Sequence, residues 1–265
     1  MTHSATEHPT STQPPARKRN PMVGALCAEF AGTMIILIFG LAVVAQVSTS
    51  ADGSLGDHDS ISWAWGLGVT LGIYVAARLS GAHLNPAVTL ALAVYKGFEW
   101  RKVGPYVLAQ LAGAFVAALI VRAAYAELIA SVDPDHTIAT QGIFSTLPGN
   151  GNDIVGQPTA FLDQLIGTAI LVFVVFALTT AWNNPPLANL GPLFVGLLVV
   201  AIGMAWGANA GYAINPARDL GPRIAHAVLP IAGKGSSDWG YAPIPVAGPA
   251  IGAILAGLFV RLLGI

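Results

Sequence analysis

Two Asn-Pro-Ala tripeptides, Asn85-Pro86-Ala87 and Asn215-Pro216-Ala217, are the residues whose types and spacing most clearly indicate chemistry. Asparagine is a suitable helix N-cap, and proline fits the first helical position, where its missing N–H costs no helical hydrogen bond. Each tripeptide therefore predicts a helix N-terminus, which carries about half a positive elementary charge. Such a place repels cations, while the asparagine amides donate hydrogen bonds to a neutral hydroxyl. The expected chemistry is contact with a neutral solute.

Other residues offer no sign of bond-making chemistry. The chain has no Gly-rich phosphate loop and no nucleophile–base pair in a recognisable motif, so we predict that it is not an enzyme. Cys27 is the only cysteine, which excludes an internal disulfide and a Cys-rich metal site. His3, His8, His58 and His136 are too scattered to form a metal site. We therefore expect no metal and no cofactor.

Each tripeptide opens an apolar segment too short to cross a membrane, at residues 84–95 and 214–229. As a helix the first would be about 18 Å long, roughly half of a bilayer. A chain end inside hydrocarbon leaves backbone groups unpaired unless it lines a water-filled path. These segments therefore predict two half-helices that begin near the midplane, one from each side.

Six longer apolar runs are long enough to cross a membrane: 22–47, 61–79, 103–125, 161–182, 190–206 and 241–263. The composition agrees, because the 265 residues are 54% hydrophobic and only 9% charged. About a quarter of the residues of a soluble domain are charged, so a soluble enzyme is excluded. A net charge of −1 gives no reason to expect a nucleic-acid partner.

The two halves of the chain repeat one another. Gly66, Gly81 and Asn85 recur at a constant offset as Gly196, Gly211 and Asn215, and Gly32-Thr33 recurs as Gly167-Thr168. Each half has three spans, an odd number, so the second half must cross in the opposite direction. Such inverted repeats place their site at the membrane midplane, between the halves.

The stretches 80–89 and 211–219, which contain the tripeptides, resemble the two signature motifs of the aquaporin family. The resemblance covers about residues 22–264. It implies an all-α membrane protein with an aquaporin-like right-handed bundle, in which six transmembrane helices and two re-entrant half-helices form an inverted repeat. It also implies one pore per chain and a homotetramer in membrane lipid.

Within that family the aquaglyceroporin branch is the more similar, because of Asp219 after the motif arginine, Arg223, and Pro245-Val246. The branch implies a passive channel for glycerol and related small neutral polyols. Water would also permeate, and ions and protons would be excluded. Two alternatives stay open: a water-selective aquaporin and, more distantly, a secondary active transporter.

The resemblance implies that Trp65, Gly203, Tyr212 and Arg218 line a narrow outer filter. Two aromatic faces would hold the CH groups of glycerol while the arginine donates hydrogen bonds to its hydroxyls. Glycine would leave room where water channels have histidine, and the tyrosine departs from the phenylalanine of bacterial glycerol facilitators. Trp65 is also compatible with the membrane interface, and Gly203 with close helix packing through Gly207.

Further residues would support the pore. The resemblance implies that Glu29 is a buried carboxylate that accepts hydrogen bonds from a half-helix loop, with Gln164 as its repeat mate in place of the usual glutamate. A proton-relay role for Glu29 in a coupled transporter is the alternative. His83 resembles a pore-lining histidine on the cytoplasmic side, although a packed core histidine fits equally well.

The basic residues predict how the chain is oriented and divided. They cluster before the first span and between the second and third, which places both termini in the cytoplasm of a multi-pass cell-membrane protein. Arg218, Arg223 and Lys234 lie on the outer side against this bias, so a specific reason is expected for each. We expect a disordered cytoplasmic tail at 1–21 and a single channel domain at 22–265. Its parts would be a first repeat at about 22–125, an extracellular connection at about 126–160, either an unstructured rim or a lid, and a second repeat at about 161–264.

Overall fold

The computed structural model describes residues 21–152 and 154–264. Nearly all of the tail expected at 1–21 lies outside the described residues. Six long apolar helices match the expected spans: α1 (Pro21–Ser48), α2 (His58–Ser80), α4 (Trp100–Ala124), α7 (Gln157–Thr179), α8 (Gly191–Ala210) and α10 (Ile244–Leu263). The prediction of six membrane-spanning helices is confirmed.

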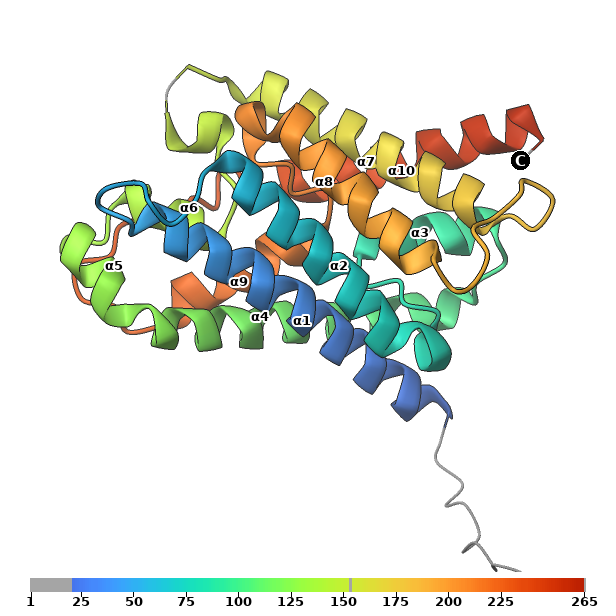
Figure 1. Cartoon of the computed structure of the whole chain (residues 1–265), viewed down its shortest axis with the longest axis horizontal. Coiled ribbons are helices and arrows are strands. Elements are labelled where there is room, and N and C mark those ends of the chain that lie inside the picture. Colours follow the sequence, from blue (N-terminus) through green and yellow to red (C-terminus); the bar gives the residue numbers. More distant parts are fainter. Residues whose placement is uncertain (1–20, 153, 265) are drawn as a thin grey trace, which may run out of the picture.

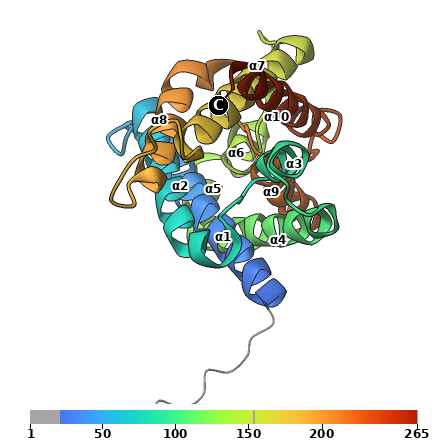
Figure 2. The same ribbon diagram turned by 90° about the vertical axis from the view of Figure 1, so that its right-hand side faces the viewer.

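The long helices stand in an open ring, and two short helices fill the gap between its two ends. Contacts run from α4 to α1, then to α2, α8, α7 and α10 in turn (Figure 2). The short helices α3 (Pro86–Tyr95) and α9 (Pro216–Val228) contact both α4 and α10 and so close the ring. In Figure 1, α3 lies toward the right of the bundle and α9 toward the left, as expected for half-helices that enter from opposite sides.

Both short helices begin as the tripeptides predict. The Asn85 side-chain oxygen accepts a hydrogen bond from the Ala87 backbone N–H at 2.8 Å, and that of Asn215 accepts one from Ala217 at 3.0 Å. A proline occupies the start of each helix, where no partner for its nitrogen is needed. The two asparagines therefore cap the helices and place their amide groups at the ends nearest the centre.

Matched glycines let the helices of the two repeats approach closely in matched ways. Gly66 of α2 and Gly196 of α8 lie against one another, and a Cβ atom on either would sit 2.5 Å from the carbonyl oxygen of the other. Gly113 of α4 and Gly252 of α10 contact α1 and α7, where an added Cβ would lie 2.3 Å and 2.2 Å from a carbonyl oxygen. Any side chain at these positions would force the helices apart.

The connection between the repeats is folded, so the first of its two expected forms, an unstructured rim, is wrong, while the second, a lid, stays a prediction. It contains α5 (Ala126–Val132), α6 (Ile138–Phe144) and the 3₁₀ turn η1 (Pro148–Gly151), at the end of the bundle that also carries the α1–α2 connection (Figure 1). Short side chains build their own hydrogen bonds here, which explains the order that composition did not indicate. Asp133, for example, accepts hydrogen bonds from the Thr137 backbone and the Thr140 hydroxyl. Burial alone would raise the pKa of Asp133, but these bonds together lower it.

Candidate functional site

A cavity of about 230 Å³ lies between the starts of the two half-helices and extends along the inside of the bundle. Its walls are mostly apolar, with a small number of polar groups, as is usual for sites that bind small molecules. One end reaches Trp65 and Arg218, and the other reaches Thr179 and Pro192 near the α7–α8 connection. Both repeats contribute to the lining.

The two asparagines cross-link the centre of the cavity. The Asn85 side-chain nitrogen donates to the Ile214 carbonyl at 2.8 Å, and the Asn215 nitrogen donates to the Leu84 carbonyl at 2.9 Å. An amide nitrogen carries two hydrogens, so each asparagine keeps one donor that is not used in this bond. Because both residues line the cavity, these donors are placed for an oxygen atom of a passing solute.

The loops before the half-helices share an unusual backbone. Ala82 and Leu84 have φ values of 52° and 51°, and the matched residues Tyr212 and Ile214 have values of 34° and 44°. Non-glycine residues in this left-handed region cost of order 1–3 kcal/mol each, so their surroundings must hold them there. All four residues line the cavity.

Glu29 holds the first of these loops. Its fully buried carboxylate accepts hydrogen bonds from the His83 backbone N–H at 2.9 Å, the Leu84 N–H at 2.7 Å and the Gln110 side chain at 2.7 Å. An ionised carboxylate only accepts, which suits three donors. The role of Gln110 could not be predicted from the sequence, because no motif surrounds this residue and its partner lies in another helix.

Gln164 holds the second loop with a different set of partners. Its side-chain oxygen accepts from the Ile214 N–H at 2.9 Å, while its nitrogen donates to the Ala210 carbonyl at 2.8 Å. A glutamate would have no hydrogen for that carbonyl when ionised. The amide in place of the usual carboxylate is therefore the side chain that satisfies both groups.

We predict that Glu29→Gln destabilises the first loop. In either orientation the new amide nitrogen would face a backbone N–H donor, that of His83 or that of Leu84, and an unsatisfied buried group costs about 1–3 kcal/mol. The thermal unfolding temperature in detergent should fall. The matched change Gln164→Glu should also lower it, because a carboxylate would then face the Ala210 carbonyl. Unchanged stability in both variants would contradict the assignment of acceptor and donor roles.

Three of the four predicted filter residues meet at one end of the cavity. Trp65, Tyr212 and Arg218 line it, and the Arg218 guanidinium lies 4.4 Å from the centre of the Trp65 ring. Arg218 also donates to the Phe144 carbonyl at 3.2 Å, which orients it. Trp65 is 5% exposed, so its ring faces the interior rather than the membrane interface.

Gly203 differs from the expectation, because it lies behind Tyr212 rather than directly beside the cavity. A Cβ atom at this position would lie 2.9 Å from the Tyr212 Cζ and 2.8 Å from the Ser62 Oγ. The space that glycine leaves is therefore filled by the tip of the tyrosine ring. Resemblance identified the position, but it did not identify what fills the space.

Asp219 and Arg223 form a fully buried ion pair close to Arg218 in the sequence. Arg223 donates to both carboxylate oxygens of Asp219, at 2.8 Å and 3.0 Å. The Thr146 backbone N–H and hydroxyl donate to the same carboxylate at 2.8 Å and 2.6 Å. Asp219 thus anchors the segment that includes Phe144, the residue whose carbonyl orients Arg218.

Arg223 and Lys234, which the sequence predicts on the outer side, also have structural reasons for their positions. The remaining Arg223 donors reach the carbonyls of Thr146, Ser237 and Asp238, so all five of its N–H groups are engaged. Lys234 donates to three carbonyls at the end of α9, where a cation complements the helix dipole. Both are held by backbone carbonyls, which offsets the loss of water.

His83 lines the cavity and is packed as well. Its Nδ1 lies 3.2 Å from the Thr89 hydroxyl. Its ring centre lies 4.5 Å from that of Phe98 and 5.0 Å from that of Tyr106. The two interpretations of this histidine are therefore compatible in one geometry.

Comparisons with known proteins agree with this geometry. The family model described as "Major intrinsic protein" matches residues 16–260. "Glycerol uptake facilitator protein 3" of Lactiplantibacillus plantarum is 43% identical over 246 residues, which are 92% of this chain and 99% of that protein. "Glycerol uptake facilitator protein" of Bacillus subtilis is 44% identical over 236 residues, 89% of this chain and 83% of that protein. The X-ray structure of the aquaglyceroporin from Plasmodium falciparum superposes with a TM-score of 0.78 at 31% identity, covering 90% of this chain and 95% of that one.

Proposed function

The chain belongs to the major intrinsic protein family, and from that premise we propose that it is a passive channel for glycerol and related small neutral solutes, which water also crosses. The family is one of channels rather than enzymes. Passive transport needs no ATP and no cofactor, only a path along which the solute exchanges one set of weak contacts for the next.

The outer end of the cavity carries this proposal. Glycerol has a hydrocarbon side and a hydroxyl side, and the cavity offers the aromatic faces of Trp65 and Tyr212 beside the guanidinium of Arg218. The aromatic faces would contact the CH groups, and the guanidinium would donate to the hydroxyls. Deeper in, Asn85 and Asn215 would offer the next donors.

The same groups would exclude ions. Both half-helix N-termini direct their positive ends toward the centre, and Arg218 adds a full positive charge nearby. A cation or a proton would meet this barrier without its water shell, whereas a neutral solute would not. The absence of a chain of acidic side chains along the described lining residues agrees with a channel rather than a proton-coupled transporter.

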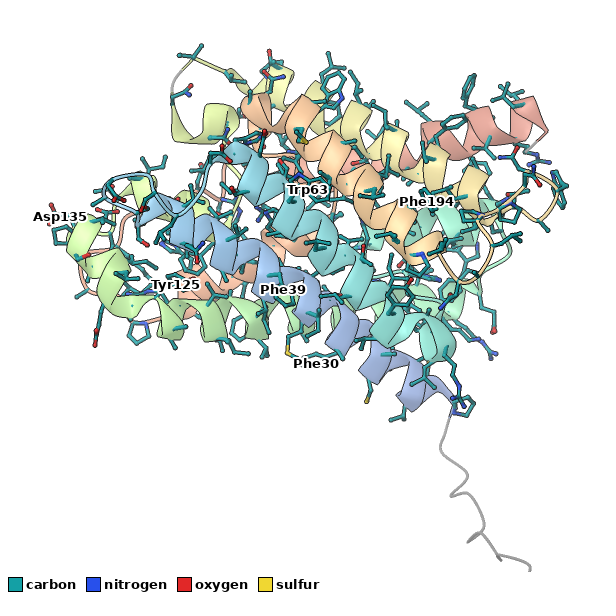
Figure 3. All side chains as sticks on the ribbon, viewed as in Figure 1. Phe30, Phe39, Trp63, Tyr125, Asp135 and Phe194 are labelled. Atoms are coloured by element: carbon teal, nitrogen blue, oxygen red, sulfur yellow. The ribbon has the colours of Figure 1, made fainter. Side chains whose placement is uncertain are left out.

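We further propose that the channel is a homotetramer in the cell membrane, surrounded by lipid, with residues 22–265 as a single channel domain. Large apolar side chains that point outward would contact lipid or neighbouring copies; Phe39, Trp63 and Phe194 are 45%, 47% and 43% exposed (Figure 3). The start of α1 and the C-terminus lie at the same end of the bundle, which supports placing both in the cytoplasm (Figure 1).

Stopped-flow light scattering on proteoliposomes tests the function. After a glycerol shock, vesicles containing the protein should shrink and then re-swell much faster than empty vesicles, with no ion gradient. An impermeant osmolyte should cause shrinkage alone. Fast shrinkage in glycerol without re-swelling would instead indicate a water-selective pore. Uptake that needs an ion gradient would indicate a secondary active transporter.

A further inference from the structure

A histidine in the first turn of α2, His58, contacts two of the predicted filter residues, Gly203 and Tyr212. The sequence does not indicate these contacts. His58 follows Asp57, which caps the helix by accepting from the Ser60 backbone N–H at 2.9 Å. The His58 Nε2 lies 2.9 Å from the Gly203 carbonyl oxygen. Because a carbonyl only accepts, this nitrogen must carry the hydrogen.

The His58 ring also meets Tyr212. The two rings lie edge to face, with centres 6.4 Å apart and an interplanar angle of 86°. This is a favoured arrangement for aromatic pairs. His58 thus bonds to the backbone behind Tyr212 and contacts the Tyr212 ring itself.

Two glycines one helical turn apart on α8 make the space for both rings. A Cβ atom on Gly207 would lie 2.3 Å from the His58 Cε1 and 3.3 Å from the Tyr212 Cδ1. A Cβ atom on Gly203 would lie 2.9 Å from the Tyr212 Cζ. Gly203 and Gly207 therefore form a shelf on which two aromatic rings pack. The spacing of the two glycines alone indicates only close helix packing.

Tyr212 depends on these neighbours, because its backbone lies in the left-handed region, with a φ of 34°. The shelf holds one side of its ring, and Ser62 lies near the ring tip beside Gly203. His58 supplies an edge contact from α2. Loss of that contact would leave room for the ring beside α2.

We propose that His58 is a further specificity-determining residue, which holds the Tyr212 ring at the outer end of the cavity and thereby limits the cross-section of the solutes that pass. It is a positioning residue, since it acts through Tyr212. This inference rests on the proposed glycerol channel, and the test below separates the two.

His58→Ala in proteoliposomes tests the proposal through the ratio of the permeability of a five-carbon polyol to that of glycerol. We expect the ratio to rise on the order of tenfold, because a small change of pocket volume changes the discrimination between solutes by about that factor. Glycerol permeability should change by less than about twofold. The matched control is Asp59→Asn, an exposed neighbour in the same helical turn, which should leave the ratio unchanged.

Two conservative variants distinguish ring packing from the hydrogen bond. His58→Phe keeps a ring against Tyr212 and should keep a ratio close to that of the unmodified protein. His58→Gln keeps an N–H donor for the Gly203 carbonyl but lacks the ring, and should behave like His58→Ala. A purely structural role would lower all fluxes together without changing the ratio.

An unchanged ratio in His58→Ala overturns the proposal. If that variant does not fold, an unchanged ratio in His58→Gln overturns it equally. Failure of the unmodified protein to carry glycerol would refute the proposed function instead. In that case water permeability of the same vesicles decides, because a released Tyr212 should raise it and an unchanged value would overturn the role of His58.

Discussion

Gly203→His is expected to reduce glycerol permeability by about tenfold or more while reducing water permeability less. The physical reason is steric, because the first added carbon already lies 2.9 Å from the Tyr212 Cζ and 2.8 Å from the Ser62 Oγ. An imidazole cannot share that space with the tyrosine ring. The ring must move toward the cavity, and glycerol, being wider than water, is affected first.

The measurement is the ratio of glycerol to water permeability in stopped-flow light scattering, with the amount of folded protein in the vesicles determined separately. Gly203→His combined with Tyr212→Ala serves as a rescue variant, since removing the ring returns the space. The double variant should recover much of the lost glycerol permeability. Equal loss of both permeabilities, without rescue, would mean that this position serves packing alone.

Much of the fold can be predicted from the sequence, because the length of each apolar run and the two Asn-Pro-Ala tripeptides can be recognised without knowing any distant contact. Six spans and two half-helix starts could be located from runs of residue types, and the inverted repeat followed from an odd number of spans per half. The boundaries differ by a few residues, since helices extend into polar capping residues: α2 begins at His58 rather than residue 61. The folded structure of the connection at 126–160 could not be predicted, because its order depends on specific hydrogen bonds.

The site was harder to predict where partners are distant in the chain. Resemblance assigned Trp65, Tyr212 and Arg218, and the structure brings them together. Gln110 and His58 could not be found in this way, because their roles depend on contacts with residues 81 and 145 positions away. Nothing in the local sequence distinguishes either from an ordinary helix residue.

The second large effect is expected from removing one partner of the buried ion pair. Arg223→Met should lower the free energy of unfolding by about 3–5 kcal/mol, the usual cost of leaving a buried charge without its partner. The Asp219 carboxylate would keep only its Thr146 donors, and the carbonyls of Ser237 and Asp238 would lose theirs. Thermal unfolding of the purified protein in detergent, followed by intrinsic fluorescence, is the measurement.

Arg101→Met is the matched control, because Arg101 forms an ion pair with Glu99 at the surface, with its own side chain 81% exposed. Exposed pairs contribute at most about 1 kcal/mol, so this variant should unfold close to the unmodified protein. The double change Asp219→Asn with Arg223→Met removes both charges and should cost less than the sum of the single changes. If Arg223→Met were no more destabilising than Arg101→Met, the pair would not be what anchors the Phe144–Thr146 segment. The orientation of Arg218, which depends on that segment through the Phe144 carbonyl, would then need another support.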